Sequence, residues 1–341
     1  MEKQYYKTGS IHKMKVLLNR LINHESISAE EAKKILISIS KGDYNASQIA
    51  SFLTVYMMRT ITVEELQGFR DALLELCIAV DLEAYNPIDL CGTGGDGKDT
   101  FNISTLSSFV TAGAGVPVAK HGNYGVSSAC GSSNILEALG VTFSNDKDHL
   151  KRAIETANIC VLHAPLFHPA MKNVAPIRKA LGIKTFFNML GPMVNPSYPK
   201  HQMVGVFNLE LLRLYNYLYQ KTDKNYSIVH DLGGYDELSL TQSAKIASNH
   251  SEWLFSPYDL ALDPVEEAAI FGGNTIKEAT QIFESIISGN GSKAQKNVVC
   301  ANAGLAIATA KQISHEEGFE QAKESLESGK AKLCLTKLIA L

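Results

Sequence analysis

Residues 91–99 read CGTGGDGKD and match two patterns of phosphate-binding turns at once. Gly92, Gly94 and Gly97 satisfy the G-x-G-x-x-G pattern, whereas Gly92, Gly97 and Lys98 satisfy the start of a P-loop. In both kinds of turn, glycines allow successive backbone N–H groups to approach one anion, and the helix that follows adds positive potential. The stretch therefore predicts a phosphate ligand, with an ordinary tight turn as the alternative.

The neighbouring residues exclude both specific patterns. A P-loop requires Ser or Thr after the lysine to hold Mg²⁺, and this chain has Asp99 there. A dinucleotide-binding turn requires an acidic residue about 20 positions later, at the end of the next strand. The next predicted strand, residues 116–119, is followed by Lys120, and Glu137 is the only acidic residue between positions 100 and 145. A phosphate-binding turn of another kind remains.

Two polar segments could complete such a phosphate site. The first follows the glycine turn directly and contains Thr100, Asn102, Ser104 and Thr105. The second follows the strand predicted at residues 116–119, in the stretch KHGNYGVSSACGSSN, and contains Lys120, His121, Asn123, Ser127, Ser128, Ser132 and Ser133. Because loops at the carboxyl ends of parallel strands meet in one crevice, a ligand with phosphates at both ends would contact both segments.

Asp236 and Glu237 are adjacent acidic residues in the stretch VHDLGGYDELSL, after a strand predicted at residues 226–230. In a loop, two neighbouring carboxylates can face one cation, and Mg²⁺ is usually held by one or two carboxylates together with substrate phosphates. The pair therefore indicates a candidate Mg²⁺ site. An acidic turn without a metal is the alternative.

The elements that must position these residues fall into two regions. Before residue 82 the sequence is helical, with an amphipathic run over residues 14–22 and three further runs that each follow a capping-box pattern. The capping pairs are Ser28 with Glu31, Asn45 with Gln48, and Thr62 with Glu65. From residue 88, short apolar strands alternate with helices, and one strand is predicted to begin at Val141. We predict a helical domain over residues 1–82 and an α/β domain with a mostly parallel sheet over residues 83–341.

Composition places the chain among ordinary globular proteins and argues against several classes. Of its 341 residues, 45% are hydrophobic and 20% are charged, and the formal net charge is −3. Scattered Lys and Arg argue against a nucleic-acid ligand, and no apolar run reaches the roughly 20 residues of a membrane span. Six cysteines without C-x-x-C spacing predict free thiols, and we expect a cytoplasmic protein.

Five stretches in order along the chain resemble the anthranilate phosphoribosyltransferase family. They are DLCGTGGDGKDTFNIST, KHGNYGVSS, GSSNILEALG, HPAMKNVAPIRKALGIKTFFNMLGPMVNP and YDELS. The resemblance implies the fold of class III phosphoribosyltransferases and nucleoside phosphorylases, with residues 166–195 packing back onto the helical domain. It also implies transfer of the phosphoribosyl group of phosphoribosyl pyrophosphate (PRPP) to the amine of anthranilate in tryptophan biosynthesis. Two Mg²⁺ ions and a homodimer formed through the helical domain are implied as well.

The same resemblance implies roles for individual residues. PRPP contacts are implied for residues of the glycine turn and of both polar segments: Gly92, Gly95, Asp96, Thr100, Asn102, Ser104, Thr105, Lys120, His121, Gly122, Asn123, Ser127, Ser128 and Ser132. Anthranilate contacts are implied for Gly92, Asn123 and Arg178, and Mg²⁺ contacts for Ser104, Asp236 and Glu237. No residue is assigned as a catalytic acid or base, because the aromatic amine is neutral at pH 7 and its lone pair is already free.

Two residues depart from the family pattern: Tyr124 stands where an arginine is common, and Asn134 where an aspartate is common. Both departures remove charge from the second polar segment and leave its detail open. Two alternatives to the family reaction are a pyrimidine-nucleoside phosphorylase, which shares the general fold, and a non-catalytic protein that binds nucleic acid. The two polar segments and the acidic pair argue against the first, and the net charge of −3 argues against the second.

Overall fold

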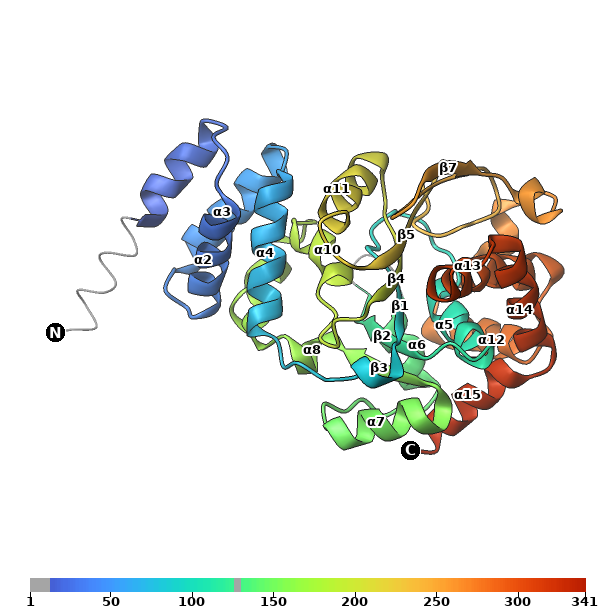
Figure 1. Cartoon of the computed structure of the whole chain (residues 1–341). Helices are drawn as coiled ribbons and strands as arrows, with labels where there is room; N and C mark the ends of the chain where they lie inside the picture. The colour runs from blue at the N-terminus through green and yellow to red at the C-terminus, as the bar shows by residue number, and fades with distance from the viewer. Residues whose placement is uncertain (1–12, 126–129) are drawn as a thin grey trace. The chain divides into compact units, whose positions relative to one another are not determined.

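The computed structural model describes residues 13–125 and 130–341, which divide into two compact units (Figure 1). The helical unit consists of Met1–Ala79 and Phe167–Pro196. The α/β unit consists of Val80–Leu166 and Ser197–Leu341. Among the described residues, no helix combines the length and the apolar character that crossing a bilayer requires.

The first segment of the helical unit forms helices over residues 13–22, Ala29–Ser40 (α2), Ala46–Met58 (α3) and Val63–Leu76 (α4). The three predicted capping boxes are confirmed, since each cap side chain accepts the N–H of the residue three positions later and that residue's side chain accepts the cap N–H. The second segment adds Pro169–Asn173 (η2), Ala175–Leu181 (α9), Phe187–Leu190 (α10) and Gly191–Met193 (η3).

Four aromatic rings join the two segments of the helical unit. Phe52 and Tyr56 lie on α3, Phe69 lies on α4, and Phe186 comes from the second segment. Phe186 stacks on Phe69 with ring centroids 4.5 Å apart and meets the other two rings edge to face. Burial of large rings in such pairs is a major source of stability, so Phe186 joins the second segment to the core of this unit.

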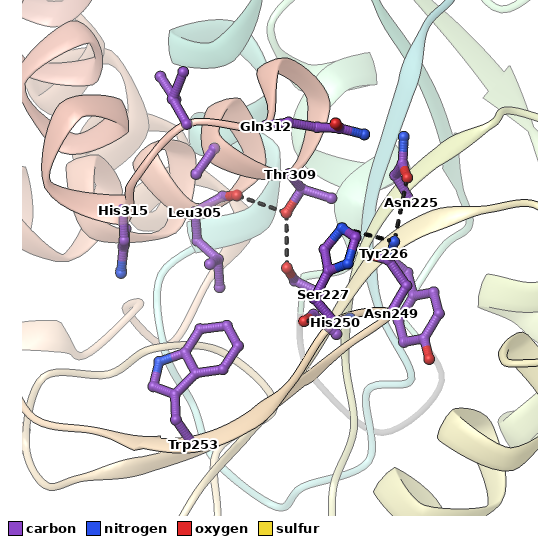
Figure 2. A pocket seen from close by; sticks show the side chains of 13 residues that line it. Asn225, Tyr226, Ser227, Asn249, His250, Trp253, Leu305, Thr309, Gln312 and His315 are labelled. Carbon is purple, nitrogen blue, oxygen red and sulfur yellow. Dashed lines mark hydrogen bonds between the residues drawn. The ribbon is translucent and has the colours of Figure 1, made fainter.

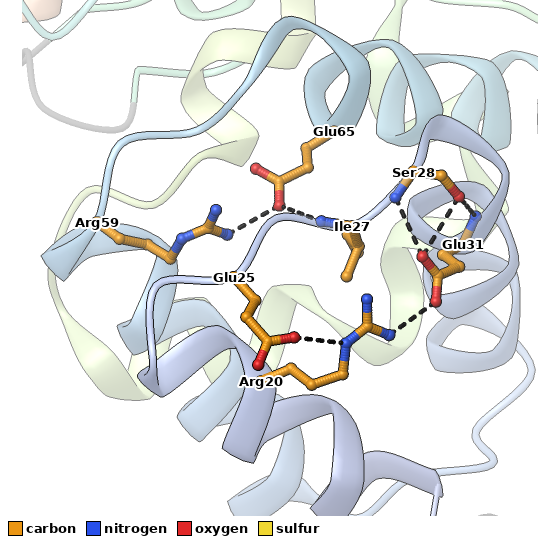
Figure 3. A network of polar contacts seen from close by, with 7 residues as sticks. All are labelled: Arg20, Glu25, Ile27, Ser28, Glu31, Arg59 and Glu65. Atoms are coloured by element: carbon orange, nitrogen blue, oxygen red, sulfur yellow. Dashed lines mark hydrogen bonds and ion pairs between the residues drawn. The ribbon is translucent and has the colours of Figure 1, made fainter.

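A buried carboxylate also links the helices of this unit (Figure 3). Glu65 is completely buried, and its Oε1 accepts the Ile27 N–H at 3.0 Å and a bond from Arg59 Nη1 at 2.8 Å. The Tyr56 hydroxyl donates to the same oxygen, and the Thr62 N–H donates to Oε2. Both carboxylate oxygens of Glu65 therefore accept hydrogen bonds, and Arg59 supplies the opposite charge that a buried carboxylate requires.

The α/β unit is built on a seven-stranded sheet in the order β3-β2-β1-β4-β5-β6-β7. The strands are Ile88–Gly92 (β1), Val118–Gly122 (β2), Ile159–His163 (β3), His201–Gly205 (β4), Asn225–Asp231 (β5), Ala244–Ser248 (β6) and Glu252–Phe255 (β7). The first five strands pair in parallel, and β6 and β7 are antiparallel. The prediction of a mostly parallel sheet is confirmed, and the strand order reverses between β1 and β4, where open α/β sheets place their ligands.

Helices cover both faces of this sheet, with α5 and α13 on one face and α11 on the other (Figure 1). The helices are Ile103–Gly113 (α5), Ser132–Ala138 (α6), Lys147–Ala157 (α7), Ala164–Phe167 (α8), Leu209–Tyr219 (α11), Ile276–Ile287 (α12), Lys293–Lys311 (α13), His315–Glu327 (α14) and Lys330–Ile339 (α15). Shorter helical turns are Glu83–Tyr85 (η1), Pro257–Leu260 (η4) and Glu267–Ile270 (η5). The long helix α13 is buried from Val298 through Ala308, so it forms the centre of one core layer.

The strand predicted to begin at Val141 is wrong. Residues 141–146 form no strand, because the Val141 N–H donates to the Leu136 carbonyl and closes the turn after α6. Gly140 has a φ of +93°, which ends the helix, and Asp146 already caps α7. The apolar side chain of Val141 is buried within this short connection rather than in the sheet.

Candidate active site

The glycine turn that follows β1 needs its glycines for two physical reasons. Gly94, Gly95 and Gly97 have φ values of +61°, +76° and +76°, a backbone region that residues with a Cβ rarely adopt. Gly92 has an ordinary φ, but a Cβ there would lie 2.4 Å from Oδ2 of Asp236. The turn is therefore shaped both by its own dihedral angles and by a carboxylate from a distant loop.

Asp236 lies across the carboxyl ends of β1 and β4. Its Oδ2 accepts the N–H of Gly94 at 2.7 Å. A Cβ on Gly205, the last residue of β4, would lie only 1.4 Å from the carbonyl oxygen of Asp236. The loop after β5 thus packs directly on the two strands between which the strand order reverses, and it fixes the position of the glycine turn.

Three carboxylates gather at this point. One oxygen each from Asp96, Asp236 and Glu237 lies within 4.8 Å of the others. Burial raises the pKa of the Asp96 carboxyl to about 6, with a further contribution from the charge of Asp236. Burial also raises the pKa of Glu237 well above its ordinary value, with contributions from Asp236 and then Asp96. Such a concentration of oxygen ligands and negative charge suits a divalent cation.

The segment after the glycine turn leads into α5. Thr100 pairs with Phe271 in an isolated bridge, and Asn102 is the N-cap of the helix. The Asn102 side chain makes no capping bond, because its Nδ2 donates to the Cys130 carbonyl at 3.1 Å instead. Ser104 lies half-buried in the first turn, and Thr105 is fully buried. Because no side chain caps this helix, its first backbone N–H groups remain able to donate hydrogen bonds to an anion. This arrangement suits the phosphate ligand that the sequence predicts.

The second polar segment begins within the last three residues of β2. Lys120 is 1% exposed and its Nζ donates to the Leu90 carbonyl at 2.8 Å. A Cβ on Gly122 would lie 2.5 Å from Oγ of Ser132, whose hydroxyl donates to the Asn123 carbonyl at 3.2 Å. Gly122, Asn123 and Ser132 therefore lie together, and His121 is buried beside them. The predicted residues Ser127 and Ser128 lie outside the described residues.

The two departures from the family pattern both support this segment. Oδ1 of Asn134 accepts the N–H groups of Gly125 and Gly131, each at 3.0 Å. The ring of Tyr124 lies edge-on against the ring of His163, with centroids 4.8 Å apart. Asn134 thus fixes the second polar segment by hydrogen bonds to its backbone, and Tyr124 fixes it by packing against a neighbouring ring.

Comparison with known proteins decides the family. Residues 15–77 match the model of the glycosyl transferase family, helical bundle domain, and residues 84–332 match that of the glycosyl transferase family, a/b domain. Anthranilate phosphoribosyltransferase of Christiangramia forsetii is 66% identical over 318 residues, covering 93% of this chain and 96% of the relative. That of Flavobacterium psychrophilum is 66% identical over 325 residues, covering 95% and 98%. The chain belongs to the anthranilate phosphoribosyltransferase family.

Solved structures of the family agree with this assignment. Anthranilate phosphoribosyltransferase from Thermus thermophilus has a TM-score of 0.88 at 31% identity and covers 95% of this chain and 98% of its own. The enzyme from Saccharomyces cerevisiae in complex with PRPP and Mg has a TM-score of 0.88 at 26% identity and covers 96% and 97%. The family, the two-part fold and the phosphoribosyltransferase activity in tryptophan biosynthesis that the sequence predicts are confirmed. The phosphorylase and nucleic-acid alternatives are not supported.

Arg178, the residue that the family resemblance assigns to anthranilate, belongs to the helical unit. Its Nη2 donates to Oδ1 of Asn188 at 3.1 Å, and its guanidinium carbon lies 5.4 Å from the centre of the Phe187 ring. Oδ1 of Asn188 also accepts the N–H of Thr185, so the amide is itself held in place. Burial lowers the pKa of the Arg178 guanidinium. A neutral amide and a ring orient this cation without neutralising it, which leaves its charge for a ligand.

Sequence reasoning missed two members of the site. The sequence places Asp96 only among the PRPP contacts, yet this residue lies with Asp236 and Glu237. Its signal is an acidic residue inside a glycine turn that is otherwise suited to an anion. Gly205 carries no such signal, because a single glycine at the end of an apolar strand does not reveal that a distant loop packs on it.

A cavity of about 370 Å³ in the α/β unit is separate from these residues (Figure 2). It lies between α13 and the start of β5, with Trp253 on one wall. Its polar side chains pair with the protein: Oγ of Ser227 bonds to Oγ1 of Thr309 at 2.7 Å, and Asn249 donates to Asn225. Among the described residues that line it there is no Lys, Arg, Asp or Glu, so it offers neither a basic side chain to a phosphate nor a carboxylate to Mg²⁺.

Proposed function

We propose that this chain binds PRPP with Mg²⁺ in the crevice formed by the glycine turn, the start of α5, the second polar segment and the loop after β5. The observation that carries the proposal is the carboxylate cluster of Asp96, Asp236 and Glu237, which lies against a turn shaped for an anion. Three carboxylates and a polyanionic substrate are compatible only when a cation lies between them.

The proposed contacts follow from the placement of the residues. The glycine turn and the first turn of α5 contribute backbone N–H groups and hydroxyls, and the second polar segment contributes a cation and an amide. The proposed PRPP-binding residues are those predicted from the sequence: Gly92, Gly95, Asp96, Thr100, Asn102, Ser104, Thr105, Lys120, His121, Gly122, Asn123, Ser127, Ser128 and Ser132. The two serines outside the described residues are carried by the family resemblance alone.

The residues proposed to hold Mg²⁺ are Asp236, Glu237 and Ser104, and the carboxylate cluster adds Asp96 to this set. Their donor atoms are all oxygens, which is the ligand chemistry that Mg²⁺ prefers. When bound, Mg²⁺ would neutralise the charge that grows on the departing pyrophosphate. The related yeast enzyme was solved with PRPP and Mg, and the sequence resemblance predicts two ions.

Anthranilate carries a carboxylate, and Arg178 offers a guanidinium whose planar fork matches that group. We propose Arg178, with Gly92 and Asn123, as the residues that bind it. The related yeast enzyme has been solved in complex with 4-fluoroanthranilate. The contacts of Arg178 with Asn188 and Phe187 hold the guanidinium before the substrate arrives, which reduces the entropy lost on binding.

The reaction is a substitution at the anomeric carbon of the ribose. A bond forms between the amine nitrogen and that carbon, the bond to the pyrophosphate oxygen breaks with its electron pair, and the amine loses a proton to water. The backbone N–H groups of the glycine turn stabilise the negative charge that develops on pyrophosphate. Holding both substrates in place supplies the proximity contribution, and no side chain needs to act as a strong base.

The test is direct. Purified protein with PRPP, anthranilate and Mg²⁺ should consume the fluorescence of anthranilate, because the amine is converted to a glycosylamine. Omitting PRPP or adding a chelator of Mg²⁺ should each abolish the change. If chelation of Mg²⁺ left turnover unchanged, the proposed role of the metal would be wrong. If the complete mixture showed no turnover, the proposed function would be wrong. The homodimer and the cytoplasmic location stay predictions, and light scattering of the purified chain would check the first.

A further inference from the structure

Strands β1 and β2, which carry the glycine turn and the second polar segment, part from each other soon after they begin. β1 pairs with β4 over five residues, and β2 pairs with β3 over five residues. Between β1 and β2 the register contains the single pair Ile88 and Val118. The backbone groups beyond that pair therefore need other partners, because buried N–H and C=O groups are rarely left unpaired.

Two buried side chains fill the gap, one from each strand. Asp89 is completely buried on β1, and its Oδ1 accepts the N–H of His121 at 3.1 Å. Lys120 is buried on β2, and its Nζ donates to the carbonyl of Leu90 at 2.8 Å. Side-chain atoms thus take the places that backbone atoms would occupy in a continuous ladder. The spacing between the two strand ends is set by the lengths of these side chains.

The charges of the two side chains also support each other. Burial lowers the pKa of Lys120, and the carboxylate of Asp89 is the strongest of the neighbouring charges that oppose this effect. The second carboxylate oxygen, Oδ2, receives the Sγ–H of Cys91 at 3.6 Å. A buried ammonium without a counter-charge is costly, so Asp89 helps to keep Lys120 both charged and in place.

We propose that Asp89 is a positioning residue that sets the separation of the two PRPP-binding segments. It does not touch the substrate, and it acts through His121 and Lys120. Gly92 follows it by only three residues on β1, and His121 is the next-to-last residue of β2, just before the second segment leaves the sheet. The inference rests on the proposed function of the crevice and adds a residue that neither the motif nor the family resemblance singles out.

A purely structural buried acid would behave differently. Its removal would lower the melting temperature and the fraction of active protein, and the enzyme that remained folded would keep its KM values. A positioning residue changes the KM for PRPP in the folded enzyme, because the two segments no longer match the distance between the phosphates. The KM for anthranilate should change less, since Arg178 is proposed to carry most of that recognition.

The experiment compares Asp89→Ala, Asp89→Asn and the control Cys91→Ala in the full chain. Cys91→Ala removes a contact to the same carboxylate but none to His121 or Lys120. We expect Asp89→Ala to raise the KM for PRPP about tenfold, and Asp89→Asn, which keeps an oxygen acceptor but loses the charge, to raise it about threefold. The control should stay near the wild-type value.

Hydrogen exchange at the His121 amide, followed by mass spectrometry, gives a second measurement that does not need turnover. Exchange should accelerate in Asp89→Ala and stay slow in Asp89→Asn and in Cys91→Ala. Wild-type KM for PRPP in Asp89→Asn would overturn the proposal, as would unchanged exchange in Asp89→Ala. If Asp89→Ala does not fold, the Asn variant and the control decide. If the wild-type chain shows no turnover, the dissociation constant of PRPP with Mg²⁺, measured by calorimetry for the same variants, takes the place of the KM, and an unchanged constant in both Asp89 variants would overturn the positioning role.

Discussion

Glu65 in the helical unit and the carboxylate cluster of Asp96, Asp236 and Glu237 in the α/β unit are stabilised in opposite ways. Glu65 in the helical unit lies 2.8 Å from the Arg59 guanidinium and accepts further backbone and hydroxyl donors. In the α/β unit, Asp96, Asp236 and Glu237 lie against one another. The first arrangement is complete without a ligand, and the second gains from a cation. A buried charge that the fold itself balances therefore indicates structure, and one that the fold leaves unbalanced indicates function.

Replacing Glu237 by Gln is the strongest test of this contrast. The change keeps the shape of the side chain and removes one charge from the cluster. We expect kcat to fall by about 10²–10³-fold, because a charge-stabilising group aimed at the leaving pyrophosphate is lost. The melting temperature of the metal-free protein should stay the same or rise, because like charges no longer repel. Anthranilate fluorescence against Mg²⁺ concentration, with melting curves, gives both results.

A matched control for that variant is Glu266→Gln, an exposed acid of the α/β unit. It should leave both kcat and the Mg²⁺ titration unchanged. If Glu237→Gln titrates with Mg²⁺ as the wild type does, the cluster is not the metal site. If its melting temperature falls sharply, the cluster contributes to stability and the contrast with Glu65 is lost.

Replacing Glu65 by Gln should show the opposite behaviour. Arg59 would be left buried without its counter-charge, so we expect a loss of about 3–5 kcal/mol in the free energy of unfolding. The control is Glu31→Gln, which breaks the bond to Arg20 at the exposed end of the same network (Figure 3). An exposed pair is worth about 0–1 kcal/mol, so this control should unfold almost as the wild type does.

Urea unfolding followed by circular dichroism measures both variants of the helical unit. The KM values of the folded Glu65→Gln enzyme for PRPP and Mg²⁺ should match those of the wild type. Equal losses of stability in Glu65→Gln and Glu31→Gln would mean that burial of the pair has no energetic consequence. That outcome would remove the reason for calling the Glu65 network structural.

Arg178 extends the comparison to a cation. It is oriented by Asn188 and Phe187 and lacks the carboxylate partner that Arg59 has among the described residues. We expect Arg178→Ala to raise the KM for anthranilate about 10–100-fold, because a charge-assisted contact is lost, with a smaller effect on the KM for PRPP. Lys179→Ala is the matched neighbour and should change neither value. Equal rises in both KM values for Arg178→Ala would argue against a carboxylate contact.

The smallest of the expected effects is a change in the free energy of unfolding with pH, caused by titration of Asp96. The pKa of Asp96 is raised from 3.8 to about 6, so the folded chain binds this proton more tightly than the unfolded chain does. Stability from this group is present below about pH 4 and is lost as the pH rises from about 4 to about 6. We expect a loss on the order of 1–2 kcal/mol across that window, after allowing for partial solvent screening.

Melting curves at several pH values, with and without Mg²⁺, check this expectation. A bound cation stabilises the ionised carboxylates, so saturating Mg²⁺ should flatten the decline between about pH 4 and 6. The same experiment on Asp96→Asn should show no decline from this group. If the metal-free wild type instead gained stability over this window relative to Asp96→Asn, the expected sign would be wrong.

The local features of the fold follow from the sequence because they depend on nearby residues. The caps of α2, α3 and α4 need only a hydroxyl or amide and a partner three positions later. The sequence does not predict the strands β6 and β7, because they are short and their side chains show no clear alternation. At Val141 an apolar run resembles a strand, although a helix-ending glycine and a cap six residues later leave no room for one.

The types and order of the site residues were determined by the sequence itself. A glycine turn, two polar segments and an acidic pair indicate phosphate and Mg²⁺ chemistry through their composition alone. What only the tertiary structure decided is distance: that Asp236 lies on Gly92 and Gly205, and that Asp96 joins the acidic pair. It also decided that Asp89 and Lys120 bridge two parting strands. These contacts join residues about 30 to 140 positions apart, and such approaches depend on how the sheet orders its strands, which no local pattern encodes.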